Sequence, residues 1–119
     1  MNRFEVCIDV TDPDVVRPFW QVALGYEPVE VADGAVILKD PAGIGATVWF
    51  QRVPEAKDTK NRVHLDVWPG SESDVRILAA KLTELGGSGL REFDDFIVFA
   101  DPEGNELCLI WEELDSPEH

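Results

Sequence analysis

One order of elements, a strand, a helix and three strands, occurs twice along the 119-residue chain, and this repeat strongly constrains the fold. Leu24-Gly25 and Leu85-Gly86 close the two helices, and the motif Asp-Pro-x-Gly opens the last strand of each half at Asp40 and at Asp101. Both pairs of landmarks are 61 residues apart. Each motif alone is common in helix ends and turns. Their shared spacing predicts one domain of two similar modules, over about residues 1–55 and 61–113.

Hydrophobic alternation and turn residues predict where the elements lie. Thr11-Asp12 is a candidate cap for a helix from Pro13 to about Leu24, and Pro18 should kink that helix or delay its start. A second helix should follow the capping residues 70–73 and end at Gly86. Strands are predicted over residues 3–10, 26–31, 35–39, 46–53, 61–68, 89–93, 96–100 and 106–111.

Composition excludes several classes of partner. With 24 acidic and 10 basic residues the net charge is -14, which disfavours nucleic acid and anionic membrane surfaces as partners. No apolar run is long enough to span a bilayer, and no signal-peptide pattern opens the chain, so we expect a cytoplasmic, soluble protein. Cys7 and Cys108 lack the spacing of a zinc ribbon, and a disulfide between them is not expected in a reducing compartment.

The segment Asn61–Trp68 has the most informative alternation. Its apolar residues suit a core, whereas His64, Asp66 and Trp68 would project from the other face. A half-polar strand ordinarily faces water. Other strands carry similar side chains on the same kind of face, namely Glu5, Cys7 and Asp9 on the first and Thr47, Trp49 and Gln51 on the fourth. We therefore predict that these faces line one shared space.

The chain resembles the vicinal oxygen chelate superfamily of glyoxalases, bleomycin resistance proteins and extradiol dioxygenases, and within it the small glyoxalase-like branch. The resemblance covers nearly the whole chain and rests on residues 12–27, 50–66 and 101–108. It implies an α+β fold in which two βαβββ modules form a curled mixed sheet, a half-barrel cup with the helices outside. The apolar residues expected beneath the helices are Phe4, Val6, Ile8, Val48, Phe50, Val63, Leu65, Val67, Leu107 and Leu109.

The resemblance also implies a place for a metal. Enzymes of this superfamily hold one divalent ion with four side chains, usually His or Gln, Glu, His and Glu, from the first and last strands of both modules. Carried over by position, His64 matches the third ligand, Glu5 the first and Cys108 the fourth, with Glu106 one pleat away. The second position falls on Trp49, which cannot bind a metal, or on Gln51, a weak neutral ligand. The candidate metal ligands are thus Glu5, His64, Glu106 and Cys108.

Two interpretations of this set stay open. In one, these residues form a distorted site with an open position that polarises a water or a substrate oxygen. In the other, which we favour, the metal site is degenerate and the cup binds an organic ligand without metal. The expected cofactor is accordingly either none or one divalent metal ion.

The residues expected to face the cup suggest a type of ligand. Carboxylates of Glu5, Asp9, Asp66 and Glu106 beside the indoles of Trp49 and Trp68 suit a cation with a flat or apolar body. Solvent or a subunit interface would explain Asp9, Asp66 and Trp68 equally well. Cys108 with His64 could form a nucleophile and base, but a small buried cysteine is the simpler interpretation. The predicted ligand pocket comprises Glu5, Cys7, Trp49, Gln51, His64, Asp66, Trp68, Glu106 and Cys108.

These observations predict a glyoxalase- or bleomycin-resistance-like protein that binds a small, cationic organic ligand and forms a homodimer, with no nucleic acid or membrane partner. A metal-dependent lyase, isomerase or dioxygenase is the alternative. A third possibility is a vestigial cup in a domain that acts through its dimer or a partner chain. Whether the cup closes within one chain or across a swapped dimer is left open by the sequence.

Overall fold

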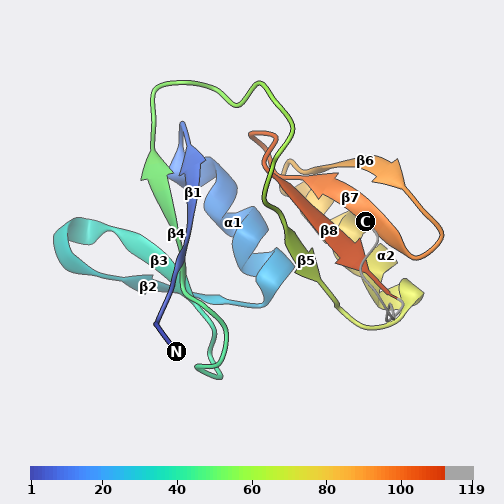
Figure 1. The fold of residues 1–119 in the computed structure, drawn as a ribbon, viewed down its shortest axis with the longest axis horizontal. Coiled ribbons are helices and arrows are strands. Elements are labelled where there is room, and N and C mark those ends of the chain that lie inside the picture. The colour runs from blue at the N-terminus through green and yellow to red at the C-terminus, as the bar shows by residue number, and fades with distance from the viewer. Residues whose placement is uncertain (112–119) are drawn as a thin grey trace.

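The computed structural model of the chain describes residues 1–111 and contains two four-stranded sheets, each with a helix on one face (Figure 1). The first half runs β1 (Val6–Val10), α1 (Pro13–Leu24), β2 (Glu27–Glu30), a short 3-10 turn η1 (Ala32–Gly34), β3 (Val36–Lys39) and β4 (Val48–Arg52). The second half runs β5 (Leu65–Val67), α2 (Glu72–Glu84), β6 (Ser88–Glu92), β7 (Phe96–Ala100) and β8 (Glu106–Ile110).

The two sheets have the same topology. Their strand orders are β1-β4-β3-β2 and β5-β8-β7-β6. In each sheet the first strand pairs in parallel with the last, and the remaining pairs are antiparallel. The predicted α+β fold of two βαβββ modules is confirmed, and the sheets do not close into a barrel.

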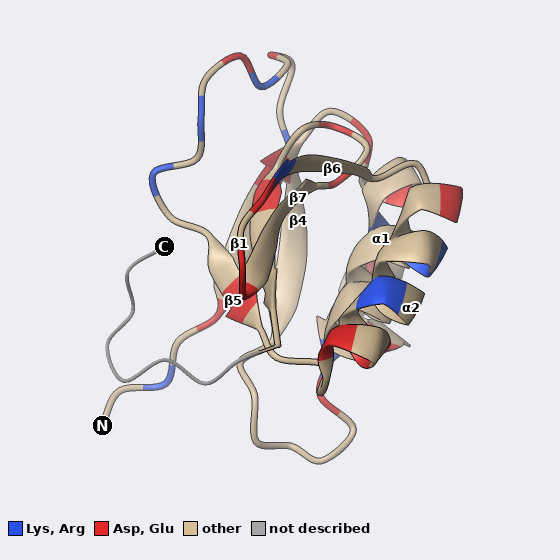
Figure 2. Cartoon of the chain, turned by 90° about the vertical axis from the view of Figure 1, so that its right-hand side faces the viewer, with Lys and Arg blue, Asp and Glu red and all other residues tan. Residues whose placement is uncertain are grey.

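Both helices lie on the same side of the sheets, which leaves the opposite faces open (Figure 2). Asp12 caps α1 by accepting a hydrogen bond from the Asp14 amide at 3.1 Å, and Gly25 ends the helix in the left-handed region at φ 68°. The helix continues through Pro18. Ser71 and Asp74 form a capping box at the start of α2, so both predicted helices are confirmed.

One hydrophobic core joins the helices to the covered faces of both sheets. It includes Val16, Phe19 and Trp20 of α1 and Leu107 and Leu109 of β8, all almost completely buried. Partly buried residues predicted to lie beneath the helices pack against it, namely Val6, Ile8, Phe50, Leu65 and Val67. The predicted orientation of these strands is thereby confirmed.

The predicted strands at residues 3–10 and 61–68 are both too long. β1 starts at Val6, and Phe4 is 65% exposed. β5 is limited to Leu65–Val67, and Val63, predicted to be in the core, is 82% exposed. The reason for the shorter β5 is its pairing, because β5 pairs with β8 only from Leu65 to Val67. The residues before Leu65 keep the alternating pattern, but they have no partner strand in the sheet. Residues 112–113 of the predicted second module lie outside the described residues.

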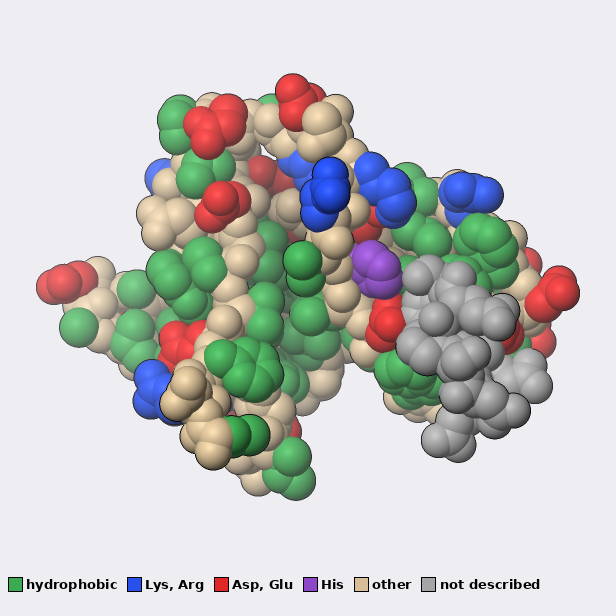
Figure 3. Space-filling model, viewed as in Figure 1, with side chains coloured by type: hydrophobic (Ala, Val, Ile, Leu, Met, Phe, Trp, Pro, Cys, Tyr) green, Lys and Arg blue, Asp and Glu red, His purple; other side chains and the backbone are tan. Residues whose placement is uncertain are grey.

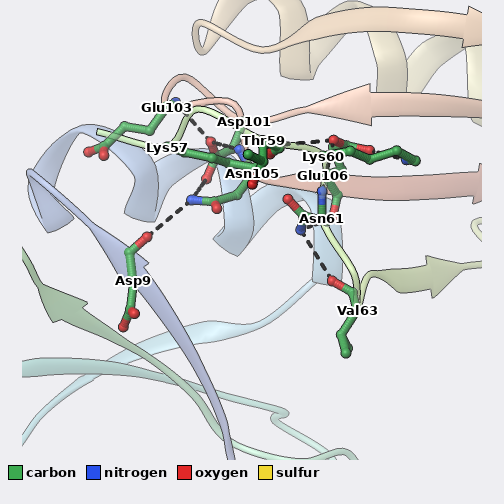
Figure 4. A network of polar contacts seen from close by, with 10 residues as sticks. All are labelled: Asp9, Lys57, Thr59, Lys60, Asn61, Val63, Asp101, Glu103, Asn105 and Glu106. Carbon is green, nitrogen blue, oxygen red and sulfur yellow. Dashed lines mark hydrogen bonds and ion pairs between the residues drawn. The ribbon is translucent and has the colours of Figure 1, made fainter. Parts of the chain in front are cut away.

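The turn between β7 and β8 ties the second module to the first (Figure 4). The Glu103 carboxylate accepts hydrogen bonds from the backbone amides of Thr11 at 2.6 Å and Asp12 at 2.8 Å. Buried Asp101 accepts a hydrogen bond from the Trp20 indole at 2.8 Å. Burial raises the pKa of the Asp101 carboxyl, although the hydrogen bonds from Trp20, Asn105 and Glu103 oppose that effect. These contacts connect the modules without any pairing between the two sheets.

Within residues 1–111, none of the helices has the length and apolar character needed to cross a membrane.

Candidate functional site

Two cavities meet at the segment formed by residues 60–64, which precedes β5. The first, of about 630 Å³, lies between β1 and the connector that links the modules. The second, of about 740 Å³, lies on the second module and is lined by residues of β6, β7 and β8 and by their connecting hairpin. Figure 3 views the faces of the sheets that the helices leave open and shows Lys and Arg side chains gathered near the histidine. His64 and Glu106 line both cavities.

The second cavity has an apolar floor and an aromatic wall. Val98 and Cys108 are cross-strand neighbours in the floor. The rings of Phe93 and Phe96 stack with centroids 4.5 Å apart, and the Arg91 guanidinium lies 5.0 Å from the centre of the Phe93 ring. Flat aromatic faces beside a cavity of this size are typical of sites for small organic molecules.

Beside the floor, His64, Asp66 and Cys108 converge. Asp66 and Cys108 are register partners in the parallel pair of β5 and β8, and His64 precedes β5 on the same side as Asp66. Nδ1 of His64 lies 3.1 Å from Oδ1 of Asp66 and 3.8 Å from Sγ of Cys108. Burial, followed by the negative charge of Asp66, raises the pKa of the Cys108 thiol to about 11. Without a metal this cysteine is therefore a neutral thiol at neutral pH rather than an activated nucleophile.

Glu106 has a different role from its neighbour Cys108. Its carboxylate lies 2.5 Å from Nζ of Lys60 and 3.6 Å from Nζ of Lys57, and it accepts a hydrogen bond from the Asn61 amide at 3.3 Å (Figure 4). Burial alone would raise the pKa of Glu106, but these partners together hold it below its usual value. Glu106 thus anchors the connector between the modules.

The other predicted site residues do not join this group. Glu5 precedes β1 and pairs with Arg3 at 3.1 Å. Cys7 is exposed on β1 and lines the first cavity. Trp49 and Gln51 of β4 line neither of the two cavities, nor does Trp68, which is 53% exposed after the end of β5.

Among residues 1–111, one group of metal-binding side chains has donor atoms within 4.8 Å of one another, and it consists of His64, Asp66 and Cys108. Two predicted ligands, His64 and Cys108, belong to it. Asp66 was predicted as a pocket residue but not as a ligand. Glu5 and Glu106, the other two predicted ligands, are outside the group.

Sequence reasoning missed Lys57, which lines the first cavity and pairs with Glu106. It also missed several residues around the second cavity: Lys60, Arg62, Leu90, Arg91, Phe93, Phe96 and Val98. The lysines lie in a segment interpreted as a polar connector. The alternation of Phe96 and Val98 along β7 was a usable signal, because β7 pairs with β8 and must present one of its faces beside Cys108.

Comparison with protein families identifies the family of this chain. The model of the glyoxalase-like domain family matches residues 5–110. This chain belongs to the glyoxalase-like domain family. This match over nearly the whole chain confirms the resemblance to the glyoxalase-like branch noted in the sequence, and solved glyoxalase-type and fosfomycin resistance proteins share its fold.

Three neighbours illustrate how far this glyoxalase-like domain has diverged in sequence. The fosfomycin resistance protein FosX from Mesorhizobium loti has a TM-score of 0.72 at 13% identity, with 95% of this chain and 93% of that chain covered. The hypothetical protein SA1046 from S. aureus has a TM-score of 0.71 at 16% identity, with 93% and 94% covered. A glyoxalase/bleomycin resistance protein from Albidiferax ferrireducens T118 has a TM-score of 0.67 at 22% identity, with 92% and 98% covered. These similarities show a common fold.

Among curated protein sequences no match to this glyoxalase-like domain was found.

Proposed function

We propose that this glyoxalase-like domain binds a small organic ligand in the cavity of its second module and that the superfamily's four-ligand metal site is degenerate. The observation that carries the proposal is the cavity of about 740 Å³ walled by the stacked rings of Phe93 and Phe96. Its size falls in the range of small-molecule sites. The names of structural neighbours, which include bleomycin and fosfomycin resistance, are consistent with small-molecule binding on this fold.

A flat, apolar ligand body suits this cavity best. It would lie on Val98 and against Phe93, where apolar contact and ring stacking both stabilise it. The degenerate metal site is supported by the separation of Glu5 from His64 and by the lysine contacts of Glu106.

The charge of the ligand is a separate part of the proposal. Asp94 and Asp95 line the cavity, and their carboxylates could pair with the cationic ligand predicted from the sequence. Basic groups line it as well, and among residues 1–111 Arg62 and Arg91 have no carboxylate within ion-pair distance. The experiment therefore uses one cationic and one anionic probe.

Dye binding to the metal-free protein tests the proposal. Fluorescence titrations would use a flat anionic probe, anilinonaphthalene sulfonate, and a flat cationic probe, acridine orange. We expect at least one probe to bind, and Phe93→Ala to weaken that binding about three- to tenfold because a stacking face is lost. The matched control is Ile77→Ala, which removes another exposed apolar side chain, from α2 and away from the cavity.

The result is decisive in either direction. Binding that Phe93→Ala weakens and Ile77→Ala leaves unchanged would support the cavity as the ligand site. Absence of binding, or equal binding by both variants, would contradict it. Tighter binding of acridine orange would support a cationic ligand, and tighter binding of the anionic probe would support an anionic one.

A metal-dependent lyase, isomerase or dioxygenase is the second candidate. The convergence of His64, Asp66 and Cys108 favours it, because three protein donors are the number that catalytic metal sites commonly use. Metal-dependent turnover that is lost in His64→Ala would support this candidate over simple binding.

A further inference from the structure

We propose that His64, Asp66 and Cys108 form a zinc site within the second module alone. This ligand set differs from the one that the superfamily positions imply, because it uses Asp66 and omits Glu5 and Glu106. It does not depend on the organic ligand, so it can stand if the proposed function fails.

The positions of the donor atoms fit a tetrahedral ion. Zinc binds imidazole nitrogen and carboxylate oxygen at about 2.0 Å and thiolate sulfur at about 2.3 Å. Those bond lengths put nitrogen and oxygen donors about 3.3 Å apart and nitrogen and sulfur donors about 3.5 Å apart in a tetrahedron. The corresponding distances from Nδ1 of His64 are 3.1 Å to Asp66 and 3.8 Å to Cys108. Small side-chain adjustments would therefore admit the ion.

The backbone holds two of the three donors in place. Asp66 and Cys108 face each other in the β5–β8 register, and the β8 strand is fully buried. Access is open because His64 and Cys108 both line the second cavity. The donors are thus positioned by the fold before any ion arrives, which is what a selective site requires.

The chemistry of the donors selects the kind of metal. A thiolate with an imidazole favours zinc over magnesium or calcium, which prefer oxygen ligands. Binding replaces the thiol proton of Cys108 by the ion and releases that proton to the buffer. One thiolate and one carboxylate then balance the two positive charges of zinc, so no net charge is left in a partly buried place. Three protein donors leave a fourth position for water or a ligand.

Cobalt substitution tests the site directly. Untagged, metal-free protein would be titrated with Co²⁺, whose near-ultraviolet charge-transfer band reports a bond to thiolate sulfur. We expect a band at one ion per chain that Cys108→Ser abolishes, and an affinity reduced about tenfold or more by Asp66→Asn. Cys7→Ser and Glu5→Gln are the matched controls and should retain the band. Zinc added afterwards should displace cobalt.

A second measurement covers the case in which Cys108→Ser fails to fold. Alkylation of the unmodified protein by iodoacetamide, followed by mass spectrometry, should show that zinc slows modification of Cys108 and leaves that of Cys7 unchanged. A missing thiolate band, a band that depends on Glu5 instead of Asp66, or equal alkylation of Cys108 with and without zinc would each overturn the proposal. Dye binding in the presence of a chelator reports on the organic ligand independently.

Discussion

Two residues of β8 that lie two positions apart show how strongly local surroundings control acidity. Burial and a nearby carboxylate raise the pKa of the Cys108 thiol, whereas two lysines and a backbone amide lower the pKa of the Glu106 carboxyl. Both side chains are nearly inaccessible to solvent. The difference arises because Lys57 and Lys60 of the connector form ion pairs with Glu106, whereas at Cys108 burial and the charge of Asp66 outweigh the opposing charge of Lys60.

At the residue scale we predict that Glu106→Gln destabilises the fold by about 1–2 kcal/mol at pH 7, because it removes the charge that pairs with Lys57 and Lys60. The effect is modest because Lys60 is largely solvent-exposed, so that water screens its ion pair. Because the pKa of Glu106 is lower in the folded chain, its contribution is present above about pH 4.5, the usual value, and is lost as pH falls through the folded pKa. Urea unfolding at several pH values should show the variant and the parent converging in acid. Glu84→Gln, at an exposed position of α2, should show no such difference. A deficit that persists unchanged in acid would contradict the assignment.

At the level of elements, the end of α2 packs very closely against α1 and β7. A Cβ atom at Gly87 would lie 2.4 Å from Cε2 of Phe19 and 2.9 Å from the carbonyl oxygens of Leu82 and Ala100. Backbone oxygens cannot move aside as a flexible side chain can. Gly87 is therefore required because a larger residue would not fit. Backbone conformation is not the reason, because the φ angle of Gly87 lies outside the left-handed region.

We predict that Gly87→Ala lowers the free energy of unfolding by about 1–3 kcal/mol through overpacking. Gly89→Ala provides the control, because the nearest atom to its added methyl group would be 3.7 Å away. It should change stability by less than about 0.5 kcal/mol. Thermal unfolding followed by circular dichroism measures both. Equal effects of the two substitutions would show that the close approach at Gly87 is relieved at little cost.

In the whole molecule, the open face of the first sheet carries a row of largely apolar side chains across its four strands. The row runs from Cys7 of β1 to its register partner Trp49 of β4. Because Leu38 pairs with Val48, the next residue of β3, Ile37, lies beside Trp49. Val29 of β2 is the register partner of Ile37 and ends the row. Cys7 and Val29 are exposed. On a chain with a net charge of -14, an uncharged row of this kind is the most suitable surface for contact with a second copy.

The homodimer predicted from the sequence can be tested at this face. Sedimentation equilibrium should give twice the chain mass of 13.3 kDa. Ile37→Glu should shift the protein toward the monomer, since it places a charge in the centre of the row. Ile77→Glu, on the exposed side of α2, should leave the mass unchanged. A monomeric parent protein at tens of micromolar would contradict the prediction.

The sequence by itself determined the modules, the helix ends and most strand orientations, because these depend on periodicity, caps and turns within short segments. Asp12, Gly25 and Ser71 act locally and could be identified from their neighbours. The central position of His64 was also visible, because alternation places it opposite the core face.

Only the tertiary structure decided which polar groups meet. The pairing of β5 with β8 brings Asp66 to Cys108, and the path of the connector brings Lys57 and Lys60 to Glu106. The same pairing stops before Val63, which leaves that residue exposed despite its apolar character. Contacts between residues more than 40 positions apart depend on the course of the whole backbone, and alternation within one strand carries no information about them.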